Sequence, residues 1–183
     1  MTIKLLPILP LLALLLGAAT ITHPVKRTEL IAASVVFSIR NAGLAVNGTI
    51  GGISADIAFD PDDLDHSHMQ ATADPATVQT GIGIRDRHLL RSDYFDVKNH
   101  PRVQMVSKAF RKTGKNAFTG QFDLTIKEIT REVTIPFTAI RKSNAMVYTG
   151  EFEVNRLDFN LGEKSPILAE KVKVCIRVQG QVQ

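Results

Sequence analysis

Hydrophobic and polar residues alternate in six segments of the chain. Alternation with a period of two puts successive side chains on opposite faces of a strand, so each segment predicts a strand with one buried face. The apolar faces are Val35, Phe37 and Ile39; Ile53, Ala55, Ile57 and Phe59; Phe118, Phe122, Leu124 and Ile126; Val133, Ile135, Phe137 and Ala139; Met146, Tyr148, Phe152 and Val154; and Val172, Val174, Ile176 and Val178. The pattern predicts an all-β protein.

Turn-forming residues separate the alternating segments, at Asn41–Gly43, Asp60–Asp63, Lys112–Asn116 and Lys142–Asn144. One stretch predicts a helix: Asp86 can cap a helix that runs from Arg87 to Phe95, with Leu90 and Tyr94 on one side. About eight strands and one short helix, with no linker or repeat, predict a single domain. The architecture is an up-and-down barrel or a sandwich.

The composition favours a barrel with internal space. The chain has no tryptophan and 6% aromatic residues, yet 44% of it is hydrophobic. Small residues occupy inward positions, namely Ala55, Gly120, Ala139 and Gly150, and an eight-stranded barrel can hold one slender ligand. The Gly51-Gly52 pair permits the bend that closure requires. A fully packed barrel or sandwich remains the alternative.

The N-terminus has the pattern of a secretory signal peptide. Lys4 precedes an apolar run from Leu5 to Leu16, and Gly17-Ala18-Ala19 follows. The run is shorter than the ~20 residues that a membrane-spanning helix needs, so we expect no stable membrane span. We predict cleavage after Ala19, which gives a signal peptide at residues 1–19 and a mature domain at residues 20–183.

Charge and cysteine content exclude some functions. The net charge is +4, but Lys and Arg are spread along the chain rather than gathered with aromatic residues, so no nucleic-acid partner is predicted. Cys175 is the single cysteine, so an exported form has no internal disulfide and depends on its core for stability. Within an alternating strand, Cys175 is interpreted as a small hydrophobic residue.

The candidate chemical groups do not form a catalytic pattern. His66 and His68 follow Asp60, Asp62, Asp63 and Asp65, but this composition is typical of an exposed turn and no metal site is predicted. Asp86 and His88 lie two apart without a Gly-x-Ser-x-Gly nucleophile, and no phosphate-binding loop follows Gly81 and Gly83. We interpret Arg85 and Asp86 as an ion pair and a helix cap, and predict no catalytic residue and no cofactor.

Several blocks of sequence resemble one family. The strongest run is Thr80-Gly81, Arg85-Asp86-Arg87-His88-Leu89, Ser92-Asp93-Tyr94-Phe95-Asp96 and His100-Pro101. Further agreement comes from Ser34, Phe37, Val46, Gly48, Gly52 and Phe59-Asp60, from Gly120, Leu124-Thr125-Ile126 and Thr130, and from Asn155-Arg156-Leu157-Asp158-Phe159. From about Ser34 to Val178 the chain resembles the YceI-like family of periplasmic, polyisoprenoid-binding proteins. Asn41, Ala33 and Glu128 depart from its usual residues.

The resemblance implies an extended, antiparallel, eight-stranded lipocalin-like barrel with one short helix, which holds an isoprenoid tail. The candidate lumen residues are the inward apolar ones: Phe37, Ile57, Phe59, Phe118, Phe122, Phe137, Met146, Tyr148, Phe152 and Val174. The residues proposed for the head group or for a lid over one end are Arg85, His88, Leu89, Tyr94 and Phe95.

Three functional hypotheses follow. The first is a non-enzymatic periplasmic carrier or reservoir for an isoprenoid quinone or polyprenyl lipid, although fatty acids or their amides also suit an apolar tube. The second is an enzyme acting on such a lipid, with Asp86 and His88 as acid and base. The third is an envelope interaction module with a filled core. The oligomeric state is open, with a homodimer among the options.

Overall fold

The computed structural model describes residues 27–182 of the chain. The predicted signal peptide at residues 1–19 lies outside the described residues.

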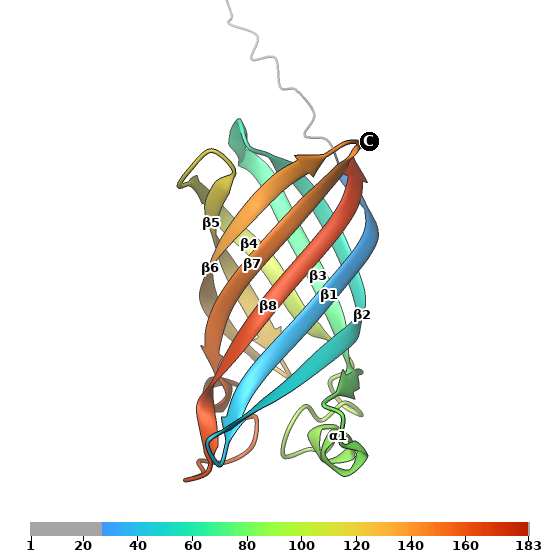
Figure 1. Cartoon of the computed structure of the whole chain (residues 1–183), viewed down its shortest axis with the longest axis vertical. Helices are drawn as coiled ribbons and strands as arrows, with labels where there is room; N and C mark the ends of the chain where they lie inside the picture. The colour runs from blue at the N-terminus through green and yellow to red at the C-terminus, as the bar shows by residue number, and fades with distance from the viewer. Residues whose placement is uncertain (1–26, 183) are drawn as a thin grey trace, which may run out of the picture.

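The described residues form a closed, eight-stranded barrel in which every strand is antiparallel to its neighbours (Figure 1). The order around the barrel follows the sequence, and β1 pairs with β8 to close it. The strands are β1 (Arg27–Asn41), β2 (Leu44–Asp60), β3 (Asp63–Gln79), β4 (Val103–Lys112), β5 (Ala117–Ile126), β6 (Ile129–Lys142), β7 (Ala145–Asn155) and β8 (Leu168–Val182). The predicted barrel and the four predicted turns are confirmed.

The predicted helix limits are wrong. Helix α1 spans Gly83–Leu89 and begins after Ile82 without a side-chain cap. Asp86 lies inside the helix and does not cap it. Its carboxylate accepts hydrogen bonds from the backbone N–H and the side-chain hydroxyl of Thr80. After Leu89 the chain turns back on itself, with the Phe95 backbone N–H donating to the Leu89 carbonyl. A single 3-10 turn, η1 (Arg156–Phe159), precedes β8 and was not predicted.

The predicted bend in the second strand is present at Gly52. This residue has a φ of +61°, and the pairing of β2 with β3 shifts register on both sides of Gly51. A Cβ at position 52 would lie 2.6 Å from the Cβ of Asp74, so the bend requires glycine both for its φ and for its close approach to β3.

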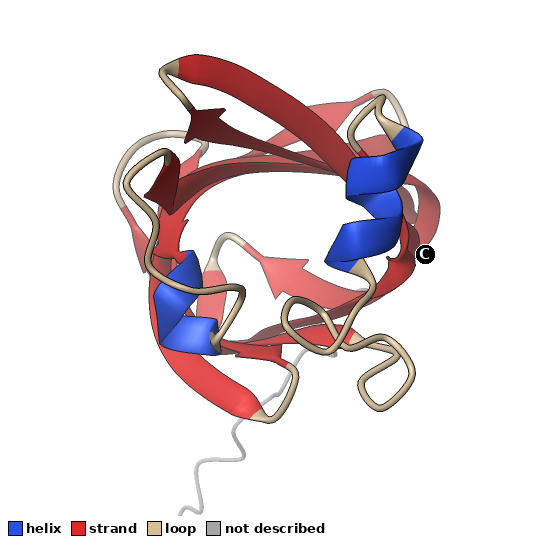
Figure 2. Cartoon of the chain, turned by 90° about the horizontal axis from the view of Figure 1, so that it is seen from below, coloured by secondary structure: helices blue, strands red, loops and turns tan. Residues whose placement is uncertain are grey.

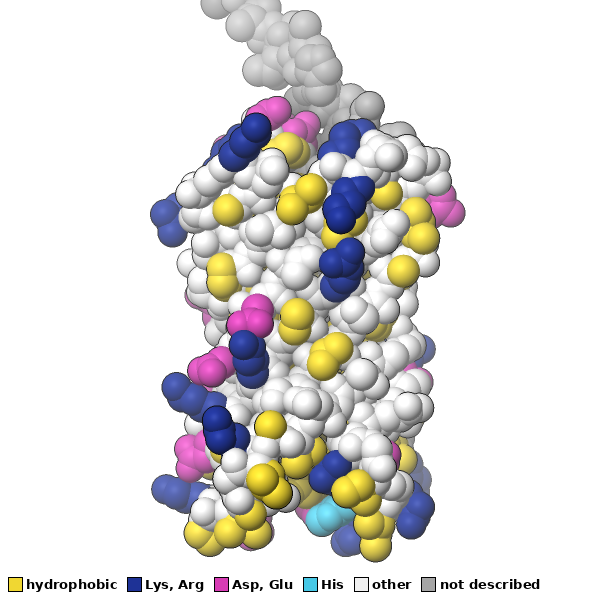
Figure 3. All heavy atoms as spheres, viewed as in Figure 1, with side chains coloured by type: hydrophobic (Ala, Val, Ile, Leu, Met, Phe, Trp, Pro, Cys, Tyr) yellow, Lys and Arg dark blue, Asp and Glu magenta, His cyan; other side chains and the backbone are white. Residues whose placement is uncertain are grey.

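The outer wall of the barrel carries the charges. Lys and Arg are interspersed with Asp and Glu over the visible face (Figure 3). Several form cross-strand pairs, such as Lys108 with Glu132 and Lys173 with Glu151, both at 2.7 Å. Exposed pairs of this kind add little stability. Folding therefore depends on the interior.

Aromatic rings fill the interior at the end where β1 begins and β8 ends, the upper end in Figure 1. Phe59 makes edge-to-face contacts with Phe118 and Phe137, at ring-centroid distances of 5.0 and 5.5 Å, and Phe118 stacks on Phe137 at 5.6 Å. Met146 and Tyr148 complete the cluster. Offset and edge-to-face pairs are the favourable arrangements of aromatic rings, so this end is a packed core.

We expect Phe118→Ala to lower the free energy of unfolding by about 3–5 kcal/mol, because Phe118 is only 2% exposed and its removal leaves a cavity among the rings. Val106→Ala, on the outer face of β4, is the matched control and should cost less than about 1 kcal/mol. Denaturation with urea measures both. A loss below about 1 kcal/mol for Phe118→Ala would show that this end is not the core.

Candidate functional site

The other half of the barrel encloses a cavity of about 410 Å³. This value falls within the usual range of small-molecule sites, about 300–1,000 Å³. Every strand contributes inward apolar side chains to the wall, including Val35, Ile53, Met69, Met105, Leu124, Ile135, Val154 and Ile176. Figure 2 views the barrel from this end, with the two helices at its edge. The predicted hollow interior is present, but only over part of the tube.

The predicted lumen residues divide between the two halves. Seven border the cavity: Phe37, Ile57, Phe122, Phe137, Tyr148, Phe152 and Val174. Phe59, Phe118 and Met146 lie beyond them in the packed cluster and do not border it. The cavity therefore ends at the level of Ile57, Phe137 and Tyr148. It is a tube closed at one end.

Tyr148, at the floor of the cavity, has a buried hydroxyl group with a polar partner. This hydroxyl lies 3.3 Å from the hydroxyl of Thr28 on β1, within hydrogen-bonding distance. Burial raises the pKa of the Tyr148 phenol above its usual value, although the Thr28 contact acts in the opposite direction. The phenol thus stays neutral at physiological pH, and the floor presents no charge.

The mouth of the cavity brings together the residues predicted for a head group or lid. Arg85, His88, Leu89, Tyr94 and Phe95 all border it, from α1 and the turn that follows. Their polar groups converge at one end of an otherwise apolar wall. This is the usual arrangement in sites that orient an amphipathic ligand.

Thr80 links Arg85 to Asp86. The Arg85 Nε donates to the Thr80 hydroxyl at 2.7 Å and one of its terminal nitrogens donates to the Thr80 carbonyl at 2.8 Å. The Thr80 hydroxyl in turn donates to the Asp86 carboxylate, which also accepts the Thr80 backbone N–H. The predicted direct ion pair is therefore wrong: both charged groups bind the threonine between them. This network holds α1 against the end of β3.

His88 has a separate partner. Its Nε2 lies 2.8 Å from the Asp93 carboxylate, and its ring packs edge-to-face on Tyr94 at 5.0 Å. The hydrogen bond from His88 holds the pKa of Asp93 below its usual value. Asp86 and His88 are thus engaged by Thr80 and Asp93, and each positions the loop at the mouth.

Arg156 is a mouth residue that sequence analysis missed. It borders the cavity and is 3% exposed, and its guanidinium donates to the backbone carbonyls of Leu161 at 2.8 Å, Glu163 at 2.7 Å and Ala169 at 3.0 Å. Arg156 therefore shapes the connection from β7 to β8. Its presence within the Asn155–Phe159 motif was the available signal.

Contacts made by Tyr94, Gly162 and Lys127 join the loops that surround the mouth. The ring of Tyr94 lies directly over Gly162, where a Cβ would come within 2.7 Å, and the Gly162 N–H donates to the Asp93 carbonyl at 2.7 Å. Lys127, in the β5–β6 turn, donates to the carbonyls of Ser92 and Asn160. The loop after α1, the β5–β6 turn and the β7–β8 connection thus form one connected border.

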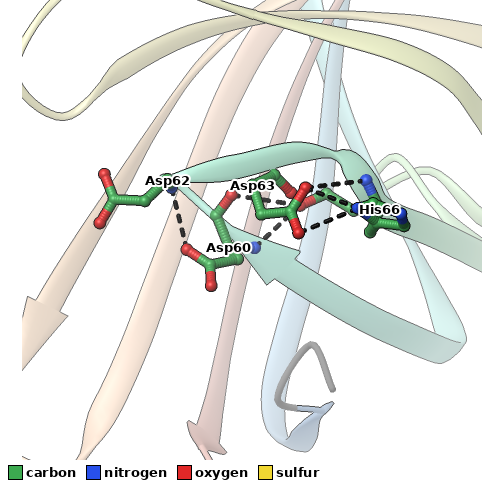
Figure 4. A network of polar contacts seen from close by, with 5 residues as sticks. Asp60, Asp62, Asp63 and His66 are labelled. Atoms are coloured by element: carbon green, nitrogen blue, oxygen red, sulfur yellow. Dashed lines mark hydrogen bonds and ion pairs between the residues drawn. The ribbon is translucent and has the colours of Figure 1, made fainter. Parts of the chain in front are cut away.

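The histidine and aspartate cluster lies at the opposite end, in the β2–β3 turn (Figure 4). His66 Nδ1 lies 2.8 Å from one Asp63 carboxylate oxygen, and Asp60 accepts the Asp62 backbone N–H at 2.9 Å. The hydrogen bond between His66 and Asp63 raises the pKa of His66 and lowers the pKa of Asp63. Within residues 27–182, no group of three or more such side chains is placed to hold a metal ion.

The fold and the cavity define a closed up-and-down β-barrel with an internal apolar site. A family model described as the YceI-like domain matches residues 30–180. The chain belongs to the YceI-like family.

Relatives match at low identity. The UPF0312 protein of Ectopseudomonas mendocina is 25% identical over 155 residues, which is 81% of each chain, and protein YceI of Escherichia coli is 24% identical over 159 residues, or 82% of each. For a UPF0312 protein of Pseudomonas putida, 27% identical over 93 residues, the match spans about half of each chain, 51% of this one and 48% of that one.

Two solved structures show the same fold. Burkholderia cenocepacia BcnA superposes with a TM-score of 0.79 at 24% identity, over 84% of this chain and 99% of that one. A polyisoprenoid binding domain from Saccharophagus degradans superposes with a TM-score of 0.68 at 10% identity, over 88% and 100%. At such identities the likeness establishes the fold alone. Within the part of the chain described, no helix has the length and apolar character of a membrane span.

We expect Arg156→Met to lower the free energy of unfolding by about 1–3 kcal/mol, because it removes the donor from the buried Leu161 carbonyl and from the partly buried carbonyls of Glu163 and Ala169. Backbone amides of residues 160–168 should then exchange hydrogen faster, which mass spectrometry measures. Arg177→Met, on the exposed face of β8, is the control and should change neither quantity measurably. Unchanged exchange in Arg156→Met would contradict the positioning role.

Proposed function

We propose that this protein binds a long isoprenoid lipid, such as an isoprenoid quinone or a polyprenyl chain, with its tail inside the barrel. The observation that carries the proposal is the tube itself: apolar walls, a closed floor and polar groups at a single mouth. Transfer of apolar surface out of water contributes roughly 25 cal/mol per Å², so a tail gains stability by entering it.

The wall of the cavity is apolar over its length and combines small residues, such as Ala55 and Ala71, with the rings of Phe37 and Phe122. The solved relative from Saccharophagus degradans, described as a polyisoprenoid binding domain, adds support from a protein of the same fold. Fatty acids or their amides are the second candidate ligands, since apolar walls discriminate weakly between chains.

The polar head group would then lie at the mouth, near Arg85 and His88. Both border the cavity, and their existing partners, Thr80 and Asp93, hold them in place. Donor groups fixed in this way suit carbonyl or phosphate oxygens.

A binding role is favoured over catalysis. Asp86 accepts hydrogen bonds from Thr80 and His88 is held by Asp93, so both side chains have structural partners at the mouth. An interaction module with a filled core is disfavoured by the 410 Å³ of internal space. We infer a carrier or reservoir that makes and breaks no covalent bond.

We infer a periplasmic location, after removal of residues 1–19. The basic, apolar and small-residue order at the N-terminus and the family resemblance support it. Intact-mass measurement of protein from the native host should give a chain that begins at Thr20. A mass that includes the apolar run would overturn the cleavage.

The direct test is to purify the protein from its native host and extract it for lipid mass spectrometry. An isoprenoid lipid in stoichiometric amount is expected. Protein that comes out empty and takes up neither ubiquinone nor polyprenyl phosphate would overturn the proposal, and a fatty acid as occupant would select the second candidate.

A matched pair of variants tests whether the cavity is the site. Ala55 faces the cavity, whereas its neighbour Ser54 is exposed on the outer face of β2. Ala55→Phe should lower ubiquinone binding by about tenfold or more, since its ring occupies the tail's space, while Ser54→Phe should bind within about twofold of wild type. Equilibrium dialysis measures ubiquinone binding by both variants. Equal binding by Ala55→Phe and Ser54→Phe would place the ligand outside the cavity.

A further inference from the structure

Among the described residues, half of the eight exposed large hydrophobic side chains lie at the mouth of the barrel. They are Leu44 at 73%, Ile84 at 72%, Ile167 at 62% and Ile82 at 51%. Figure 3 shows hydrophobic side chains crowded at this lower end, on both sides of the molecule. Isolated exposed hydrophobic residues, such as Ile31 and Ile140 on the wall, are ordinary, but a group at one functional end is not.

These four residues, named here the mouth rim, stand on opposite sides of the opening. Leu44 begins β2 and Ile167 precedes β8, and the two segments are joined by the hydrogen bond from the Ala42 N–H to the Ile167 carbonyl at 2.7 Å. Ile82 and Ile84 stand at the start of α1, across the mouth in Figure 1. The rim therefore presents apolar side chains on both sides of the entrance to an apolar cavity.

Cations accompany both sides of the rim. Arg40 donates to the Gly43 carbonyl at 3.1 Å, which holds its guanidinium beside the Leu44 turn. The Arg87 guanidinium lies over Gly83, 3.5 Å from where a Cβ would stand, beside Ile82 and Ile84. The carboxylates of Asp86 and Asp93 on the same segment are engaged by Thr80 and His88. Apolar side chains with adjacent cations suit a surface of anionic phospholipid.

We propose that the mouth rim docks on a bilayer that contains anionic phospholipid, so that the lipid tail passes between bilayer and barrel without crossing water. The inference rests on the proposed function, because it is the apolar cargo that makes direct contact with a membrane useful. Leu44, Ile82, Ile84 and Ile167 enter the interface between head groups and acyl chains, and Arg40 and Arg87 contact the phosphates.

The test measures flotation of the chain from Thr20 onward, which retains every described strand, with vesicles of phosphatidylcholine and phosphatidylglycerol. The double variant Leu44→Asp with Ile84→Asp should bind about tenfold more weakly or worse, since it removes apolar contact on both sides and adds charge. The wall variant Ile31→Asp with Ile140→Asp is the matched control and should bind within about twofold of wild type. Arg40→Gln with Arg87→Gln should reduce the dependence on phosphatidylglycerol and on salt.

Uptake of detergent-dispersed ubiquinone without vesicles separates this proposal from the proposed function. Rim variants should take up the dispersed quinone as wild type does, but extract it from vesicles more slowly.

Two outcomes overturn docking and leave the proposed function standing. In the first, wild type takes up dispersed quinone yet does not float with vesicles. In the second, rim and wall variants lose flotation equally. If neither ubiquinone nor polyprenyl phosphate is taken up, the function itself fails. A dimer in sedimentation that the rim variants convert to monomer, with flotation unchanged, would make the rim an interface between two copies and overturn docking.

Discussion

Closure of the hydrogen-bonded sheet is the constraint on which the rest of the structure depends. The pairing of β1 with β8 joins the first strand to the last and gives every strand an inner and an outer face. Period-two sequences then send their apolar residues inward together. Because backbone pairing sets the width of the barrel, side-chain size determines which levels are filled and which are hollow.

That division of the interior links stability to binding. The rings around Phe59 and Phe118 supply packed core at one end, so the other end can stay open without support from its own contents. The border of the mouth is held by polar contacts instead, through Thr80, Lys127 and Arg156. Backbone carbonyls accept most of these bonds, so loops of irregular shape are fixed around the entrance without filling it.

The sequence was informative about strands and less so about the site. Alternation located six strands, but in β3 the inward Ala71 and Ala73 are too small to stand out from polar neighbours. The helix start was misplaced because the partner of Asp86 is Thr80, six residues earlier, rather than a free helical N–H. Phe37 and Phe59 occupy equivalent alternating positions, yet Phe37 lines the cavity and Phe59 lies in the packed core. The residues across the barrel set this difference. Arg156 was missed because its acceptors are carbonyls that only the folded chain brings together.

The packed floor beneath the cavity has a consequence for access. The rings around Phe59 and Phe118 block passage through their end of the barrel, so no straight channel runs through the molecule from end to end. A molecule held in the cavity that is longer than the hollow stretch would keep its remaining length outside the barrel, in contact with the surroundings.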